Sequence, residues 1–209
     1  MEAKRNFLII FVFYKLTLLN ASIVNEKHDI LKIVLANYID ENFDFNMKIK
    51  PLNCQPIHLL CTRKSQDLSE GGKMFFSLKN IDVNIQEQRE QYSPLHLAIL
   101  SSNLEIVKLL LNYPEIDVNR KNINNSTPLH IICQRISKND NFDINFEILK
   151  LLLDREDIDI MATNIFVSFY IFFFKSNIIE KNTTTNAIII SSVSESKKSK
   201  RNLQLHYTF

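Results

Sequence analysis

The chain has 209 residues, enough for one domain or a short array of repeats. Its 25 basic and 23 acidic side chains nearly cancel, so the net charge does not favour binding to nucleic acid. The only two glycines, Gly71 and Gly72, are adjacent, which excludes the glycine-rich loops that cradle phosphate groups. The three cysteines are too few and odd in number for a disulfide framework, and they fit a reducing compartment.

An apolar run, "FLIIFVFY", occupies positions 7–14. It is similar to the hydrophobic part of a secretory signal peptide, but Lys15 interrupts it, and cleavage near Ala21 would remove a helix that the following sequence predicts. We therefore expect residues 1–16 to form an apolar edge that packs on the neighbouring segment. A leader or membrane anchor is the alternative.

Three short motifs recur in the same order downstream. The first contains Pro, an aliphatic residue and His, in "QPIHLLC" (55–61), "SPLHLAIL" (93–100) and "TPLHIIC" (127–133). The second is apolar, in "GGKMFF" (71–76), "LEIVKLLL" (104–111) and "FEILKLLL" (146–153). The third is "IDVN" (81–84 and 116–119) or "IDIM" (158–161). Repetition with a period of roughly 35 residues predicts a stacked array.

Each motif has a physical role in a pair of helices. Ser93 and Thr127 can accept hydrogen bonds from the backbone of the first helical turn. Pro94 suits the first helical position, where an N–H group has no partner. The apolar residues at 104–111 would form a face too wide for an isolated amphipathic helix, so that helix needs neighbours on two sides. The residues expected to build the repeats are Pro56, His58, Ser93, Pro94, His96, Thr127, Pro128 and His130.

These motifs closely resemble the ankyrin repeat, whose Thr-Pro-Leu-His-x-Ala signature matches residues 93–98 and, less completely, 127–133. The resemblance implies a mainly α fold, namely an α-solenoid of stacked helix–turn–helix units with projecting β-hairpin loops. The full repeats expected from it cover residues 47–84, 85–119 and 120–164.

Two parts of the array depart from this pattern. In the repeat at 47–84, Gln55 replaces the capping hydroxyl and both glycines fall in the second helix, where each costs about 1 kcal/mol relative to alanine. We expect this repeat to be the least stable. Upstream, residues 17–46 align as a degenerate capping repeat, with Thr17 as its N-cap and Asn20 at the histidine position.

The repeat pattern stops after Asn164. The run "IFVSFYIFFF" that begins the segment 165–190 is too short to span a bilayer, which takes about 20 helical residues. The segment has three interpretations: a cover for the last repeat, a membrane-dipping stretch, or a repeat whose reading frame was lost. Residues 191–209 are polar and expected to be disordered. Their basic cluster, Lys197–Arg201, has two functional interpretations, a nuclear-import signal or a patch that binds an anionic surface. The expected location is the cytoplasm, with the nucleus as the alternative that this cluster allows.

Motif cysteines and histidines also suggest a metal site or a catalytic pair, from Cys54, His58 and Cys61 or from His130 and Cys133. Histidines of successive repeats would lie on helices about 8–10 Å apart, too far to share an ion whose ligands lie within ~2.3 Å. We expect each histidine to bond the capping hydroxyl and nearby backbone instead. The chain is therefore expected to be no enzyme, with no cofactor, metal or small-molecule substrate.

Recognition of another protein is the function that remains. Proteins with ankyrin repeats usually meet partners through their loop tips and concave face, and the tips expected here are residues 47–53, 86–91 and 120–126. The insertion at 135–145 is a second candidate surface. The candidate partner contacts are Lys48, Lys50, Arg89, Glu90, Arg120, Lys121 and Asn124. The expected function is a non-catalytic scaffold or adaptor for a protein partner. A membrane-associated or secreted ankyrin-repeat protein is the alternative, and nucleic acid is not a favoured partner.

Overall fold

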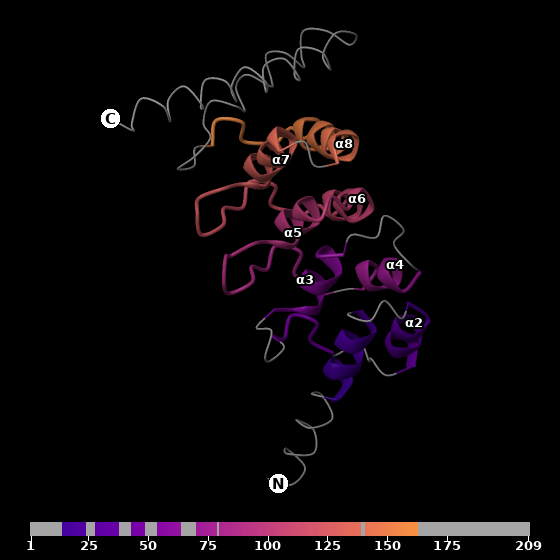
Figure 1. Ribbon diagram of the computed structural model, residues 1–209. Coiled ribbons are helices and arrows are strands. Elements are labelled where there is room, and N and C mark those ends of the chain that lie inside the picture. Colours follow the sequence, from indigo (N-terminus) through magenta and orange to yellow (C-terminus); the bar gives the residue numbers. More distant parts are fainter. Residues whose placement is uncertain are drawn as a thin grey trace, which may run out of the picture.

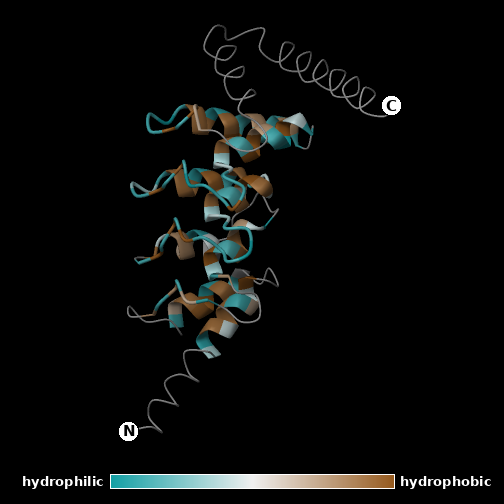
Figure 2. Ribbon diagram, turned by 90° about the vertical axis from the view of Figure 1, so that its left-hand side faces the viewer, coloured by the Kyte–Doolittle hydropathy of each residue, from teal (hydrophilic) through white to brown (hydrophobic). Residues whose placement is uncertain are grey.

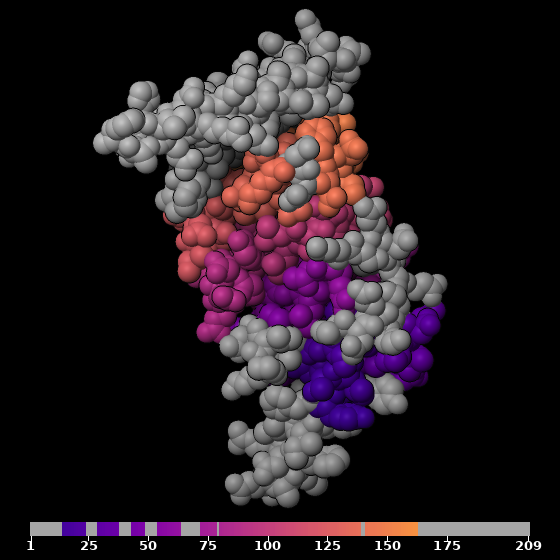
Figure 3. Space-filling view, in the orientation of Figure 1, coloured from indigo at the N-terminus to yellow at the C-terminus, as the bar shows by residue number. Residues whose placement is uncertain are grey.

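The computed structural model describes residues 14–23, 28–37, 43–48, 54–63, 70–78, 80–138 and 141–162. They form pairs of helices stacked in one column, with loops projecting from one side (Figure 1). In the space-filling view the colours change in sequence order along the molecule, so repeats adjacent in sequence are neighbours in space (Figure 3). This arrangement confirms the mainly α solenoid.

The column contains a first and a second helix in each repeat. The first repeat begins with a helix over residues 14–23. The helices that follow are α2 (His28–Asn37), α3 (Pro56–Cys61), α4 (Glu70–Phe76), α5 (Pro94–Leu100), α6 (Leu104–Leu111), α7 (Pro128–Ser137) and α8 (Phe142–Leu153). Within the described ranges there is no β-strand longer than an isolated bridge, so the loops project as expected but without regular hairpin strands.

The core lies between helices of successive repeats. Ile106, Val107 and Leu110 of α6 are completely buried, and Leu109 and Leu111 are half-buried against the same core. Such a wide apolar face needs the neighbours on two sides that α5 and α8 supply. The apolar residues gather on the helices, whereas the projecting loops are mostly hydrophilic (Figure 2).

The first helices begin at the capping residues that the sequence indicates. Ser93 and Thr127 are the N-caps of α5 and α7, and a proline follows each at the start of the helix. Gln55 holds the same place before α3. Ser93 Oγ accepts a capping hydrogen bond from His96 N–H at 3.5 Å, whereas the side chains of Thr127 and Gln55 make none. The helix α4 forms although it contains both glycines. Its lower stability stays a prediction.

The expected N-cap at Thr17 is wrong. The first described helix already includes residues 14–16, and Thr17 lies exposed inside it. Leu18 stands where the other repeats have proline, and without a proline the preceding residue is free to be helical. Asn20, at the histidine position, is 6% exposed, and neither polar atom of its side chain has a hydrogen-bond partner in the described structure.

Polar contacts join the repeats at the turns between first and second helices. The guanidinium of Arg63 donates to the carbonyl of Ile23, in the preceding repeat. The carbonyl of Arg63 in turn accepts from Nδ2 of Asn103, at 3.1 Å, in the following repeat. Asn103 is completely buried and also caps α6 by accepting from Ile106 N–H at 3.1 Å. Capping and cross-repeat bonding therefore use the same side chain.

The described residues of the insertion at 135–145 are mostly helical. It lengthens α7 to Ser137 and starts α8 at Phe142, so Asn145 lies one turn inside the helix instead of capping it. Asn145 is completely buried and its Oδ1 accepts from Ser102 Oγ at 2.9 Å, while Arg135 donates to the same hydroxyl at 3.1 Å. These contacts fasten the last repeat to the one before it, so much of the insertion is occupied by packing.

Tight turns in this chain are made without glycine. Five described residues have positive φ, the region that favours glycine, and none of them is glycine: Asn80, Gln91, Ser102, Asn125 and Asn141. For Gln91 and Ser102, whose side chains are poorly suited to this region, the backbone conformation costs about 1 kcal/mol or more.

Candidate interaction surface

The motif histidines are structural groups that link a first helix to its surroundings. Nδ1 of His58, His96 and His130 accepts from the backbone N–H of the residue at the N-cap, at 3.2 Å in each repeat. Nε2 of His58 lies 3.0 Å from the carbonyl of Ile85, and Nε2 of His96 lies 3.0 Å from that of Ser126. Because Nδ1 is the acceptor, Nε2 carries the proton and donates. Each of these two rings therefore ties its helix to a loop of the array.

The environment of the histidines keeps them neutral. Burial lowers the pKa of all three rings, that of His96 to about 4. Among the described residues no group of three or more His, Cys, Asp and Glu side chains could hold a metal ion. Cys61 and Cys133 are buried, and burial raises the pKa of both thiols, which disfavours the reactive thiolate.

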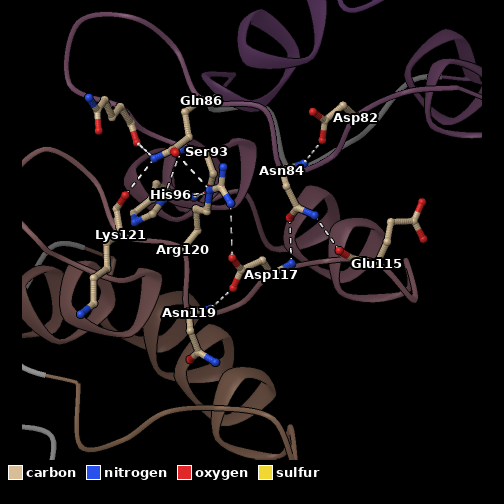
Figure 4. Close-up of polar contacts among 11 residues, drawn as sticks. Asp82, Asn84, Gln86, Ser93, His96, Glu115, Asp117, Asn119, Arg120 and Lys121 are labelled. Atoms are coloured by element: carbon tan, nitrogen blue, oxygen red, sulfur yellow. Dashed lines mark hydrogen bonds and ion pairs between the residues drawn. The ribbon is translucent and has the colours of Figure 1, made fainter.

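A ladder of asparagine side chains runs between the bases of the projecting loops. Nδ2 of Asn84 donates to the carbonyl of Glu115 at 2.6 Å, and its Oδ1 accepts from Asp117 N–H at 2.7 Å (Figure 4). Asn46 makes the same pair of bonds to Asn80 and Asp82, and Asn119 makes it to Asp157 and Asp159. The recurring Asp-x-Asn of the third motif was the signal for this ladder. The motif alone gives no indication that its asparagine bonds to the next repeat.

The ladder stops at the last repeat. In "IDIM" the asparagine is replaced by Met161, which has no amide group and is 68% exposed. The aspartate of the motif still closes its local turn, because Oδ1 of Asp159 accepts from Met161 N–H at 2.9 Å. The last copy of the motif therefore keeps the hydrogen bond within its own turn, but it lacks the asparagine that bonds to the next repeat.

We name residues 85–92 and 120–126 the central finger loops. The first is built around Glu87, whose carboxylate accepts from the backbone N–H groups of Arg89 and Glu90 at 2.6 Å and of Tyr92 at 3.1 Å. Burial alone would raise the pKa of Glu87, but these backbone hydrogen bonds, that from Tyr92 foremost, outweigh it and lower the pKa. The carboxylate thus stays charged and fixes the loop from within.

In the second central finger loop, the side-chain amide of Asn122 fixes the backbone in the same way. Oδ1 of Asn122 accepts from the N–H groups of Asn124 and Ser126, at 3.0 and 2.9 Å. The backbone N–H of Asn122 donates to the Ser126 carbonyl at 3.0 Å, and the side chain is 4% exposed. Both loops therefore have an internal polar support, so their outer side chains are not needed to hold their shape.

The two central finger loops are bonded to each other. Nε2 of Gln86 donates to the Lys121 carbonyl at 2.8 Å, and Oε1 of Gln86 accepts from Arg120 Nε at 3.0 Å (Figure 4). A backbone bond of 3.0 Å runs from Ile123 N–H to the Glu90 carbonyl. The loops form one continuous surface as a result.

The structure places the candidate contacts in different situations. Arg89, Lys121 and Asn124 are exposed on the central finger loops, and Lys48 is exposed one repeat earlier. Arg120 is also exposed, but besides its bond to Gln86 it lies 3.8 Å from Asp117.

Two further candidates differ from this group. Glu90 is half-buried, and Lys50 lies outside the described residues. Sequence reasoning missed Gln86 and the exposed Ile123 on the same surface. Their signal was weak, because neither belongs to a recurring motif.

Comparison with known proteins agrees with this architecture of helix pairs and projecting loops. A family model described as ankyrin repeats (3 copies) matches residues 66–164. Residues 66–164 thus carry ankyrin repeats, as the motifs indicate.

Individual relatives match over shorter stretches. The I-Kappa-B like proteins C2 and G2 of Microplitis demolitor bracovirus (isolate Webb) are 35% identical over 54 residues and 40% identical over 60 residues. These stretches are 26% and 29% of this chain and 30% and 36% of those proteins. A probable serine/threonine-protein kinase of Dictyostelium discoideum is 35% identical over 71 residues, 34% of this chain and 8% of the kinase. The chain spans well under half of each relative.

The sequence ends bear on the membrane alternative. In the ranges that the structure describes, no helix is both long enough and apolar enough to cross a membrane. The segments 165–190 and 191–209, and residues 1–13, lie outside those ranges. Their interpretations stay predictions.

Proposed function

We propose that this protein is a non-catalytic scaffold or adaptor whose ankyrin repeats bind another protein through the central finger loops. The observation that carries the proposal is that different residues pack the core and face the solvent. The helices spend their apolar faces on packing, whereas Arg89, Lys121 and Asn124 are exposed on loops that Glu87 and Asn122 hold from within. Variable side chains on a rigid framework are suited to recognition.

The array that we propose as the scaffold includes the degenerate first repeat at 17–46. Its support is the bond from Asn46 to the Asn80 carbonyl, at 2.9 Å, which repeats the asparagine ladder one unit earlier. Three free cysteines, two of them buried, suit a reducing compartment, so we propose a cytoplasmic location.

The proposal is tested by affinity capture with the full chain and two matched charge reversals. The finger variant carries Arg89→Glu, Arg120→Glu and Lys121→Glu. The control carries Lys73→Glu, Lys108→Glu and Lys150→Glu, three exposed cations on the second helices. We expect the wild type and the control to capture the same protein, and the finger variant to lose it. Capture that survives in the finger variant and fails in the control would move the site to the second helices.

A further inference from the structure

The central finger loops are ordered before any partner arrives. Gln86 bonds both Arg120 and the backbone of Lys121, and the Ile123 N–H bonds the carbonyl of Glu90. Ordering a loop on binding costs conformational entropy, and these contacts remove part of that cost. The surface that the loops share is therefore suited to a partner of defined chemistry.

Its free charge is positive. Arg89 and Lys121 are exposed, and neither forms an ion pair within the described structure. The acids nearby are already engaged: Glu87 holds three backbone N–H groups, and Asp117 pairs with Arg120. Glu90 is the acid that remains on the two loops, and it is half-buried. Two unpaired cations therefore face solvent, while the carboxylates of Glu87 and Asp117 are held by hydrogen bonds and an ion pair within the protein.

An apolar group lies on the same surface. Ile123 belongs to the second central finger loop and is 54% exposed, although its backbone is fixed by the bond to Glu90. An exposed aliphatic side chain on a rigid loop loses little entropy when a partner covers it. Covering it fully would strengthen binding by roughly five- to thirtyfold.

We propose, building on the function above, that the central finger loops bind an acidic protein segment carrying an aliphatic side chain beside its carboxylates. The carboxylates meet Arg89 and Lys121, and the aliphatic side chain covers Ile123. A nucleic acid fits less well, because binding its backbone commonly uses about 6–10 phosphate contacts and these loops offer two unpaired cations. Its base edges would also leave Ile123 uncovered or poorly matched.

The test uses defined peptides and the full chain. One short fluorescein-labelled peptide has a leucine flanked by glutamates, with serine and glycine for solubility. A second replaces the leucine by serine, and a third replaces the glutamates by lysines. Fluorescence anisotropy measures each affinity at low salt, where surface charges are least screened. A single-stranded oligonucleotide of similar length is the fourth probe.

We expect the acidic leucine peptide to bind at least about tenfold more tightly than the other three probes. Arg89→Glu with Lys121→Glu should weaken it by roughly tenfold or more, and Ile123→Ser should remove its preference for leucine over serine. The matched control, Lys108→Glu with Lys150→Glu, should bind as the wild type does. Circular dichroism of each variant establishes that it is folded.

Other outcomes overturn the inference. Equal binding of acidic and basic peptides, tighter binding of the oligonucleotide, or an unchanged leucine preference in Ile123→Ser contradicts the proposed chemistry. If no peptide binds while capture still depends on the finger loops, the acidic partner is wrong and the scaffold function stands. If capture also ignores the finger loops, both proposals fail.

Discussion

The side chain of Asn84 bonds the backbone of Asp117, with 2.7 Å between Asn84 Oδ1 and Asp117 N, across the boundary between two repeats. Its Nδ2 reaches the Glu115 carbonyl as well. One amide therefore satisfies a donor and an acceptor of the next loop. Because a stacked array is held only by contacts between neighbours, such a bond acts on the stability of the whole column.

Replacing Asn84 by alanine should lower the free energy of unfolding by about 1–2 kcal/mol, the net value of two such hydrogen bonds. Urea denaturation followed by circular dichroism measures the loss. The control is Asn124→Ala, which removes an exposed side chain from the second central finger loop and should change stability by less than about 0.5 kcal/mol. Equal effects of the two variants would mean that the ladder is not a stabilising element.

Gln91 has φ of 56°, so the Gln91→Gly variant should be more stable than the wild type. Relief of the backbone strain outweighs the extra entropy of glycine in the unfolded chain, so Gln91→Gly should raise the free energy of unfolding by about 0.5–1 kcal/mol. The matched control is Gln88→Gly in the same loop, where φ is not positive and glycine brings no relief. The same denaturation experiment serves both variants. A destabilised Gln91→Gly would show that the strain is not the dominant cost.

The buried histidines make stability depend on pH. Burial lowers the pKa of His96 from 6.5 to about 4 in the folded state, and it lowers those of His58 and His130. The unfolded chain therefore takes up protons first as the pH falls. The contribution of these groups to stability is complete above pH 6.5 and is lost progressively towards the folded pKa.

The measurement is the urea midpoint at several pH values from about 7.5 to about 5, above the range where most carboxylates titrate. We expect the midpoint to fall steadily below pH 6.5. In His96→Gln the fall should be shallower, although the variant is less stable at every pH. A midpoint that stays constant down to pH 5 would contradict neutral, buried histidines.

Replacing Gln86 should weaken partner binding, although its side chain is half-buried. Its side chain joins the central finger loops through Arg120 and the Lys121 carbonyl, so Gln86→Ala frees one loop from the other. We expect affinity for the captured partner to fall several-fold, because the loops must then be ordered on binding. Titration calorimetry should show a less favourable entropy. The control is Gln88→Ala, an exposed neighbour in the same loop. Similar losses in both variants would argue for direct contact by glutamines instead of ordering.

The sequence predicts the helix pairs well because their signals are local. Ser93 and Pro94 identify the start of α5 from adjacent positions, and the stripe at 104–111 shows the helical period by itself. The prediction of an N-cap at Thr17 was wrong because it also relied on local signals. Leu18 follows Thr17, and unlike proline it does not prevent the preceding residue from being helical. Local motifs therefore give the elements, and they fail where one key residue is exchanged.

The links between repeats could not be read in this way. Asn84 finds its partners 31 and 33 residues further along, and Ser102 and Asn145 meet across 43 residues. The insertion at 135–145 stays a candidate surface, but the sequence did not show that the helices α7 and α8 extend into it. It contains no glycine or proline, so α7 continues into it as far as Ser137 and α8 begins within it at Phe142. Candidate contacts such as Arg120 could be selected from their charge alone. Their bonds to other residues of the chain could be recognised only from the fold.

Photo-crosslinking tests the central claim, binding through the central finger loops, most directly. A photoreactive amino acid is placed at Asn124, on a central finger loop, or at Lys108, on the exposed side of α6, in otherwise unchanged full chains. Both positions are exposed, so either probe is tolerated by the fold. The account predicts a covalent product with the captured protein from position 124 and none from position 108. A product from position 108 alone would contradict it.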